Sequence, residues 1–354
     1  MFLPIEGGDI HMIYDAFGEK FECWVPPFGY GRNELTGEIE KCDVIKRNSK
    51  KEEQKWERED LPDWYEKKRE QEEIMQEADP DYVDLECEKV RERHWGRRIR
   101  GCWFWNNGER VYLPGRFWFL LNWWNYQGKY FDFRMPNLDL AYVLQYCYED
   151  PDCRGLIEVT KRKDGKTGRA GCFAYEYISR AQSKHGGAQS KTKEDAEELF
   201  AKAIVTPFTK LPHFFQPIHD RSSGDIPKKE LRFFHTSRKG VRKKKKLDPA
   251  LESWIDFKNA IASAYDGPEL HWYISDECGK LELISILERD NVVRMCSEVN
   301  GRYVGFHHYT TTVEDMEGGG SEFLDLLKMS NRREVNRSWR TGSGMYVLFM
   351  PSYR

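Results

Sequence analysis

The sequence has no long hydrophobic run, little net charge and no cysteine pair at metal-binding spacing. Apolar runs such as Phe117–Leu121 are far too short to cross a bilayer, so we expect no membrane partner. The opening segment, MFLPIEGGDI, lacks a basic stretch followed by an apolar core, and we therefore expect no secretion signal. A net charge of −3 gives no reason to infer a nucleic-acid partner from the overall balance.

The 9 cysteines are dispersed, and none lies in a C-x-x-C pair or beside histidine at zinc spacing. An odd, scattered set is typical of reduced thiols in a cytoplasm. We therefore expect neither a disulfide framework nor structural zinc.

The chain of 354 residues is long enough for two domains and a substantial core. Hydrophobic residues make up 39% and charged residues 32%, which indicates a globular protein with a heavily charged surface. We predict an N-terminal helical and aromatic extension over residues 1–100 and a second domain over 101–354.

Residues 1–45 carry proline and glycine with little periodicity, and we interpret them as mostly loop. Residues 46–79 are mostly charged, with mixed sign, which predicts one or two exposed helices broken near Pro62 and ended by Pro80. A solvated helix packed along one edge explains this stretch better than a partner-binding arm. Downstream, the Asn-Asn-Gly turn predicts a hairpin of 102–105 with 110–113, and 117–124 reads as a buried segment.

Several helices are predicted around the middle of the chain. Residues 138–147 and 168–182 have helical spacing, and the stretch 183–190 (SKHGGAQS) reads as a break. Thr192 and Asp195 form a capping-box pattern, and apolar residues follow at helical spacing at Ala196, Leu199, Phe200, Ala203 and Ile204.

The stretch 155–171, GLIEVTKRKDGKTGRAG, reads as strand, cationic loop and helix. A loop of backbone N–H groups ending at a helix N-terminus can surround phosphates. Lys166 would reach the β and γ oxygens, and the Thr167 hydroxyl would bind Mg²⁺. The pattern G-x-x-x-x-G-K-[ST] requires glycine where the chain has Thr160. Alone, Gly-Lys-Thr indicates only a lysine-bearing turn, so the interpretation depends on further parts of a nucleotide site.

One such part is the apolar run 270–277, LHWYISDE, which ends in two carboxylates. In P-loop NTPases a strand next to the phosphate loop ends in an acidic residue that holds Mg²⁺, which fits Asp276. The adjacent Glu277 has the reach to deprotonate an attacking water. A buried strand ending at a helix N-cap is the alternative. The two motifs together, in this chain order, favour the NTPase.

A third strand is predicted at 302–309 and runs into Thr310, Thr311 and Thr312. Hydroxyls at the end of a strand beside the phosphate-loop strand can sense the γ-phosphate, although threonine is also common at strand ends for its β-propensity.

The motif set resembles the large terminase subunit of tailed double-stranded DNA phages, most closely those of gut Bacteroides-type hosts, including the crAss-like group. The resemblance covers residues 101 to 354 and rests on TKRKDGKT (160–167), AQSKTKEDAEELF (188–200), PFTKLPHFFQP (207–217), YDG (265–267), ISDECGK (274–280), TTTVEDMEGGG (310–320) and GMYVLFMP (344–351).

The resemblance implies an α/β fold, an ASCE-type P-loop ATPase with a mainly parallel central sheet flanked by helices. Family members carry an arginine three positions before the second glycine of the loop, which here is Arg162, with a catalytic role on the γ-phosphate. Lys166 and Glu277 would share the catalysis, and Thr310, Thr311 and Thr312 would couple hydrolysis to DNA movement. ATP and Mg²⁺ are the implied cofactors. The nucleotide would contact the whole loop: Thr160, Lys161, Arg162, Lys163, Asp164, Gly165, Lys166, Thr167 and Gly168.

The family contacts adenine before the phosphate loop, which points to the neighbourhood of Phe133, Arg134 and Gln145. An arginine acting between subunits could be any of Arg294, Arg302, Arg332 and Arg333. The basic run 238–246 is the candidate DNA contact.

As partners, the resemblance implies double-stranded DNA, the portal protein, the small terminase subunit and a ring of identical subunits on the procapsid, in the bacterial host cytoplasm and not in the mature virion. The family's nuclease domain is expected to be absent, so no DNA cleavage is expected. The alternatives are another ASCE nucleic-acid-dependent ATPase or helicase, and a non-hydrolysing binding protein with a degenerate loop.

Overall fold

The structure, a computed structural model, describes residues 6–46, 55–222, 224–235, 250–261, 263–281, 284–312 and 320–350. The basic run 238–246 therefore lies outside the described residues. Among the described helices, none is long and apolar enough to cross a membrane.

A seven-stranded sheet forms the centre of the fold, in the order β10-β11-β9-β12-β15-β8-β16. Only β10 is antiparallel to its neighbour, and all the other pairs are parallel. The predicted α/β fold with a mainly parallel sheet is confirmed. The strands are β8 (Gly155–Thr160), β9 (His185–Gln189), β10 (Glu230–Phe233), β11 (Ser253–Phe257), β12 (Trp272–Asp276), β15 (Phe306–Thr312) and β16 (Met345–Met350).

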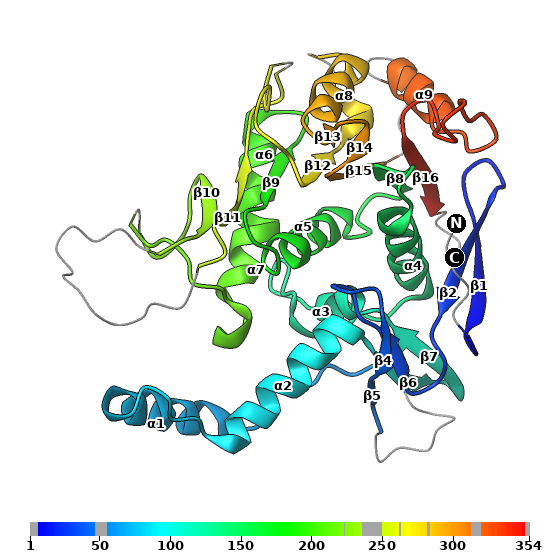
Figure 1. The fold of residues 1–354 in the computed structure, drawn as a ribbon. Helices are drawn as coiled ribbons and strands as arrows, with labels where there is room; N and C mark the ends of the chain where they lie inside the picture. The colour runs from blue at the N-terminus through cyan, green and yellow to red at the C-terminus, as the bar shows by residue number, and fades with distance from the viewer. Residues whose placement is uncertain are drawn as a thin grey trace.

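Helices cover both faces of this sheet, as Figure 1 shows. On one face lie α4 (Met135–Glu149) and α5 (Lys166–Ile178), and on the other α8 (Ile286–Met295) and α9 (Gly320–Met329). Side chains of β8 alternate between the two cores: Leu156 packs with the α4 and α5 side, whereas Ile157 and Val159 pack with the α8 and α9 side. A strand buried on both faces is what a parallel sheet requires, and it explains the continuous apolar character of β8.

Strand β9 corrects the sequence interpretation, because 183–190 was expected to break the structure. Its sequence HGGAQ has weak strand propensity, yet it is a central strand between β11 and β12. Close packing explains the two glycines. A Cβ at Gly187 would lie 2.7 Å from the Tyr265 ring, and one at Gly186 would lie 3.0 Å from Ile178.

The helix after β9 follows the prediction. Thr192 caps α6 (Lys193–Leu199), with its Oγ1 accepting from the Asp195 N–H at 3.1 Å. The helix continues through a π-helical turn (Phe200–Val205) into α7 (Thr206–Thr209). Helix α5 begins two residues earlier than predicted, at Lys166, and ends earlier, at Ile178.

The described part of residues 1–45 is not mostly loop. It contains β1 (Asp9–Tyr14), β2 (Lys20–Val25), β3 (Tyr30–Arg32), β4 (Ile39–Lys41) and β5 (Asp43–Val44). The pair β1–β2 lies beside β16, where Ala16 N–H donates to the Val347 carbonyl. Alternating burial along β2 is the period-2 pattern of a strand, and a short hairpin of this kind is easily masked by the surrounding glycine and proline.

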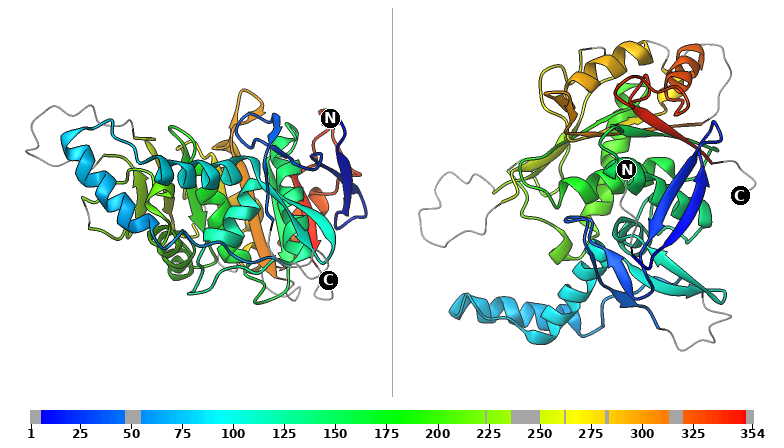
Figure 2. Two further views of the ribbon diagram at one scale, coloured as in Figure 1. Left: turned by 90° about the horizontal axis from the view of Figure 1, so that it is seen from below. Right: turned by 45° about the vertical axis from the view of Figure 1, so that its right-hand side comes forward.

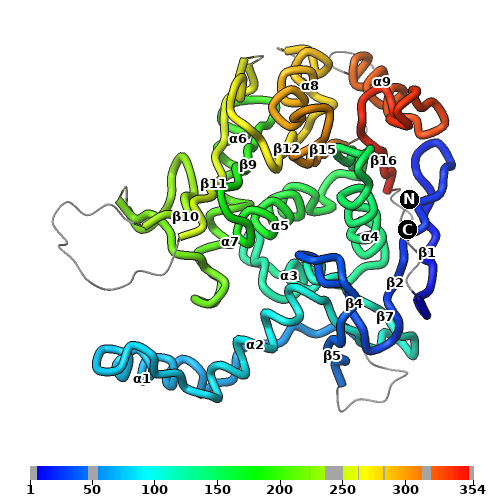
Figure 3. Tube along the Cα trace, in the orientation of Figure 1, coloured from blue at the N-terminus to red at the C-terminus, as the bar shows by residue number. Residues whose placement is uncertain are grey.

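The strand β5 pairs with β6 (Cys102–Asn106), which forms the predicted hairpin with β7 (Glu109–Leu113). The buried segment is helix α3 (Gly115–Trp123). Figure 3 follows the chain from α3 to α4 and α5. Helices α1 (Tyr65–Ala78) and α2 (Leu85–Arg100) extend away from the sheet, at the end opposite α8 and α9 (Figures 1 and 2). All nine cysteines have free thiols.

Candidate functional site

The predicted strand, loop and helix are present at 155–178. Strand β8 ends at Thr160, and α5 begins at Lys166 directly after Gly165. Gly165 has a φ of 81°, a left-handed conformation that favours glycine, and Lys163 also lies in this region at 62°. The loop thus turns sharply between a parallel strand and a helix N-terminus, which is the local geometry of a phosphate-binding loop.

The two motifs meet at the carboxyl edge of the sheet. Lys166 Nζ donates to Glu277 Oε1 at 2.6 Å, and Thr167 Oγ1 donates to Asp276 Oδ2 at 2.7 Å. Lys166 Nζ also lies 3.8 Å from Asp276 Oδ1. Four side chains from segments more than a hundred residues apart therefore form one contiguous polar cluster.

Strand β15 lies between the phosphate-loop strand β8 and the acidic strand β12, so β12 is not the direct neighbour that was expected. The N-terminus of α5 passes over β15 and brings Lys166 and Thr167 to Asp276. The expectation that the threonine strand lies beside β8 is confirmed: Thr310, Thr311 and Thr312 stand in register with Glu158, Val159 and Thr160.

Thr310 is the threonine that joins the cluster directly. Its Oγ1 donates to Asp276 Oδ1 at 2.5 Å, and both residues are buried. Thr311 Oγ1 accepts from the Gly279 N–H at 3.2 Å, just beyond Glu277. Thr312 Oγ1 is buried and has no hydrogen-bond partner among the residues that the structure describes. Thr310 thus contacts Asp276, whereas Thr311 contacts the turn after Glu277 and also donates to the Thr312 carbonyl at 3.2 Å.

Opposing effects set the charges of the central pair. Burial alone would lower the pKa of Lys166, but Asp276 and Glu277 outweigh burial and raise it. Burial alone would raise the pKa of Glu277, but Lys166 and Lys280 together lower it. Lys280 Nζ lies 2.8 Å from Glu277 Oε2. Both members of the pair are therefore charged at neutral pH, with Glu277 in the form that can accept a proton.

Glu277 also has an unusual backbone. Its φ of 54° and ψ of 35° are left-handed, which is uncommon for a residue with a side chain. Residues held in such conformations cluster at functional sites, where the surrounding structure enforces them. Here the conformation turns the chain away at the end of β12 and directs the Glu277 carboxylate to Lys166.

The remaining loop residues differ in exposure. Thr160 is buried, and its Oγ1 donates to Asp164 Oδ2 at 3.1 Å. Lys161, Arg162 and Lys163 are exposed in the turn of the loop between β8 and Gly165. Thr160 therefore supports the loop from below, in the place where the common pattern has glycine.

Two aromatic residues that the sequence interpretation missed pack on the loop. A Cβ at Gly168 would lie 2.7 Å from the Tyr126 ring, and one at Gly165 would lie 2.9 Å from the Phe131 ring. The two rings are nearly parallel, at 17°, with centroids 6.3 Å apart. Burial raises the pKa of Tyr126, and the charge of Asp276 raises it further. In the sequence, the only hint of these contacts was the aromatic stretch that precedes helix α4 and the phosphate loop.

The residues expected near adenine are spread out. Arg134 Nη1 lies 4.0 Å from Asp164 Oδ1, beside the loop. Phe133 packs on Phe104 and Phe117. Gln145 lies further along α4, where it donates to Glu149 and lines a small cavity with Arg32.

Among the four arginines considered for a role between subunits, three form ion pairs. Arg294 lies 3.6 Å from Glu298, Arg332 lies 3.8 Å from Asp15, and Arg333 lies 2.8 Å from Glu19. Arg302 is exposed on β14 (Arg302–Tyr303), which pairs with β13 (Glu298–Val299).

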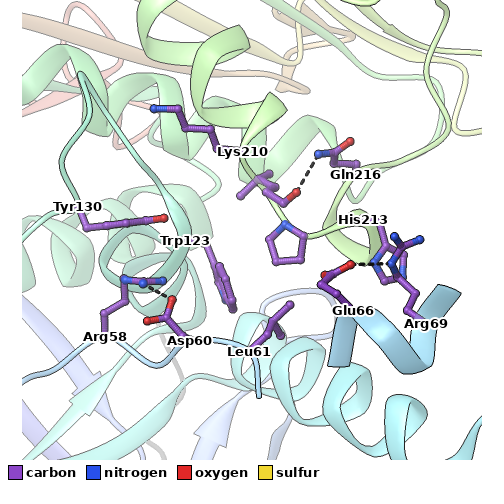
Figure 4. Close-up of a pocket in the computed structure, with 12 residues that line it drawn as sticks. Arg58, Asp60, Leu61, Glu66, Arg69, Trp123, Tyr130, Lys210, His213 and Gln216 are labelled. Carbon is purple, nitrogen blue, oxygen red and sulfur yellow. Dashed lines mark hydrogen bonds and ion pairs between the residues drawn. The ribbon is translucent and has the colours of Figure 1, made fainter. Parts of the chain in front are cut away.

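A separate cavity of about 520 Å³ lies between the segment before α1 and the stretch 210–216 (Figure 4). Two of its cations have acidic partners, since Arg58 pairs with Asp60 and Arg69 pairs with Glu66, whereas Lys210 Nζ donates to Asn125 Oδ1 at 2.7 Å. The Arg58 guanidinium also lies over the Tyr130 ring, 4.2 Å from its centroid. Part of the motif PFTKLPHFFQP therefore lines this cavity rather than the phosphate loop.

A hydroxyl and a carboxylate at one point are the oxygen donors that Mg²⁺ prefers, so Thr167 and Asp276 fit this ion. Within the described ranges, no group of three or more His, Cys, Asp or Glu side chains could hold a metal by itself. A magnesium ion here would thus depend on oxygens supplied by a nucleotide and by water.

The parallel sheet, with β15 between the loop strand and the acidic strand, has the arrangement of an ASCE-type P-loop domain. Among solved structures, the chain is similar to the ATPase domain of the large terminase of the Thermus phage P74-26. For an arginine-to-alanine mutant of that domain, the TM-score is 0.41 with 14% identity, covering 63% of this chain and 83% of that one. A second structure of that domain gives 0.39 and 14%, covering 62% and 81%. No family model and no curated protein matches the sequence.

Proposed function

We propose that this chain is the ATP-hydrolysing motor domain of a phage large terminase, which drives double-stranded DNA into the procapsid. The observation that carries the proposal is the meeting of Lys166, Thr167, Asp276 and Glu277 within hydrogen-bond distance at the carboxyl edge of a parallel sheet. The order of the motifs along the chain supports the terminase family over other P-loop ATPases.

In the proposed reaction, residues 160–168 surround the phosphates of ATP. Lys166 exchanges its contact with Glu277 for the β and γ oxygens, because a triphosphate offers it more negative charge than one carboxylate. Thr167 and Asp276 hold Mg²⁺, which neutralises charge on the phosphates when it is bound.

Glu277, released from Lys166, then accepts a proton from the attacking water. Lys166 and Lys280 both lower the pKa of Glu277, and Lys280 remains beside the carboxylate after Lys166 has turned to the phosphates. Arg162 stabilises the charge that develops on the γ-phosphate, from its exposed position at the loop tip. The bond from Thr310 to Asp276 gives β15 a direct contact with the metal ligand, which supports a coupling role for residues 310–312.

Steady-state ATPase and nucleotide-binding measurements on wild type, Lys166→Ala and Glu277→Gln test this assignment. We expect Lys166→Ala to lose most ATP affinity. Glu277→Gln should bind ATP but hydrolyse it about 10²–10⁴-fold more slowly, the usual contribution of general acid–base catalysis. Lys202→Ala is a matched control, since Lys202 is exposed and forms an ion pair with the equally exposed Glu198.

Equal background rates in wild type and both site variants would contradict the ATPase assignment. Isolated ring ATPases can turn over slowly, so nucleotide binding is measured beside hydrolysis.

DNA translocation needs its own test. Neutralising the basic run 238–246 should weaken DNA binding on all sequences and flatten its salt dependence. The proposed partners are double-stranded DNA, the portal protein, the small subunit and further copies of this chain in a ring, in the host cytoplasm.

A further inference from the structure

Arg169 lies one turn into α5, directly below the phosphate loop, and is fully buried. Its Nη1 donates to the Asp164 backbone carbonyl at 2.5 Å and to Asn137 Oδ1 at 3.0 Å. Its Nη2 donates to Asp164 Oδ2 at 2.8 Å and to Glu158 Oε1. One side chain therefore contacts the loop, the preceding helix α4 and the strand β8.

Asp164 is the loop residue on which these contacts converge. Its Oδ2 accepts from both Arg169 and Thr160, so the two ends of the loop are tied together across its base. Asp164 directly precedes Gly165, whose left-handed backbone sets the entry into α5. The position of Asp164 thus determines where the N–H groups around Lys166 point.

Glu158 extends the contact to the neighbouring strand. Its Oε2 lies 3.0 Å from His308 Nε2 on β15, and both residues are fully buried. Since His308 Nδ1 has no hydrogen-bond partner among the described residues, the proton of a neutral ring belongs on Nε2, which donates to the carboxylate. Burial would raise the pKa of Glu158, but Arg169 and His308 lower it to about 2, which keeps the acceptor charged.

We infer that Arg169 is a positioning residue that holds the phosphate loop in its ATP-binding shape and, through Glu158 and His308, fixes β15 against that loop. This inference rests on the proposed function. His308 lies two residues before Thr310, which contacts Asp276. The buried chain Asp164–Arg169–Glu158–His308 therefore connects the phosphate side of the site with the strand that carries the coupling threonines.

A buried ion pair can also serve the fold alone, and the chain contains one for comparison. Arg98 on α2 donates to Glu176 on α5 at 2.8 Å and to Ser179 at 2.6 Å, and both members of the ion pair are buried. None of these contacts reaches the loop. Arg169 differs because two of its four bonds end on Asp164, which a purely structural arginine would not need.

The experiment measures Mg·ATP affinity with a fluorescent ATP analogue, together with thermal stability, for wild type, Arg169→Lys and Arg98→Lys. Lysine keeps the charge but cannot make the four bonds of the planar guanidinium. We expect both variants to lose stability. Arg169→Lys should also bind Mg·ATP about 10–100-fold more weakly, the size expected for a lost charged hydrogen bond. Arg98→Lys should stay within about twofold of wild type.

Two further variants separate the loop from the strand. Asp164→Asn removes the carboxylate charge that Arg169 contacts. Because Asp164 is less buried than Arg169, this variant tests the loop even if Arg169→Lys fails to fold. It should weaken binding in the same direction. His308→Leu should lower kcat with little change in KM, because it removes the contact to β15 and not the loop. His308→Gln should restore kcat, since its amide can donate to Glu158.

The outcomes distinguish the two proposals. If wild type binds Mg·ATP and Lys166→Ala does not, the proposed function stands. If in that case Arg169→Lys and Asp164→Asn bind as wild type does, the inference about Arg169 is wrong. If wild type itself does not bind Mg·ATP, the proposed function fails, and the inference fails with it.

Discussion

Replacing Thr310 with valine removes one buried hydrogen bond at almost constant shape. Thr310 Oγ1 donates to Asp276 Oδ1 at 2.5 Å, and both residues are buried. A hydrogen bond to a charged group contributes about 1.5–3 kcal/mol. Asp276 keeps its bond from Thr167 and the 3.1 Å bond from the Glu277 N–H, so its charge is not left alone. We therefore expect Thr310→Val to lose about 1.5–2 kcal/mol of stability, at the lower end of this range.

Thr312→Val is the matched control, because it is the same substitution two residues along the same strand. The Thr312 hydroxyl is buried and has no hydrogen-bond partner within the described part of the chain, so its removal should leave stability unchanged or raise it by up to about 1 kcal/mol. Urea unfolding of wild type and both variants, in the absence of nucleotide, compares the midpoints.

The functional part of the same test is a magnesium titration of ATPase activity. Loss of the Thr310 bond leaves the Asp276 carboxylate less well oriented, so Thr310→Val should need more Mg²⁺ for half-maximal activity. Thr312→Val should resemble wild type in its Mg²⁺ requirement. A loss of stability in Thr312→Val as large as in Thr310→Val would refute the reasoning, since it would show that strand propensity and not the bond to Asp276 sets the cost.

Two further predictions concern buried packing, at His94 on α2 and at Gly168 directly after Thr167. His94 is fully buried, packs on Trp118 and Trp123, and finds no hydrogen-bond partner at either ring nitrogen in the described ranges. Burial lowers its pKa from 6.5 to about 3, so the unfolded chain takes up a proton that the folded one does not, and stability falls as the pH drops from 6.5 towards 3. His94→Phe should therefore make this fall in stability shallower, by up to about 1.4 kcal/mol per pH unit. Denaturation curves at several pH values measure the effect, and a pH profile equal to that of wild type would contradict the prediction. Gly168→Ala places a Cβ 2.7 Å from the Tyr126 ring and should cost about 1–3 kcal/mol, which thermal unfolding would show. Adding Tyr126→Ala should recover part of that loss, and a Gly168→Ala protein as stable as wild type would argue against the packing of Tyr126 on the loop.

The parts of the fold that the sequence predicted are those with local signals. The capping of α6 by Thr192, the hairpin of β6 and β7 and the strand–loop–helix unit each depend on residues within a few positions of one another. Strand β9 could not be predicted, because HGGAQ becomes a strand only through its neighbours β11 and β12 and the close approach of Tyr265. Local propensity is weak evidence where tertiary packing decides.

The candidate site shows the same division. Lys166, Thr167, Asp276 and Glu277 were expected from motifs, and their meeting follows from the rule that parallel strands end at one edge of the sheet. Arg169 was not expected, because an arginine in a helix is usually exposed, and only the three-dimensional path of β8 and β15 places Glu158 and His308 beside it. Tyr126 was missed for a similar reason, since its contact with Gly168 joins segments separated by a helix.

Lys166 and Glu277 are hydrogen-bonded partners at 2.6 Å, and both side chains are shielded from much of the solvent. A variant at either position therefore also changes the environment of the other, and the effects of the two single variants on ATP affinity should not add. A double-mutant cycle compares the ATP affinities of wild type, Lys166→Ala, Glu277→Gln and the double variant, and it measures the coupling energy of this contact. If ATP breaks this contact when Lys166 binds phosphate, as proposed above, the energy of the contact is subtracted from the intrinsic affinity of the loop, and Glu277→Gln should bind ATP more tightly than wild type.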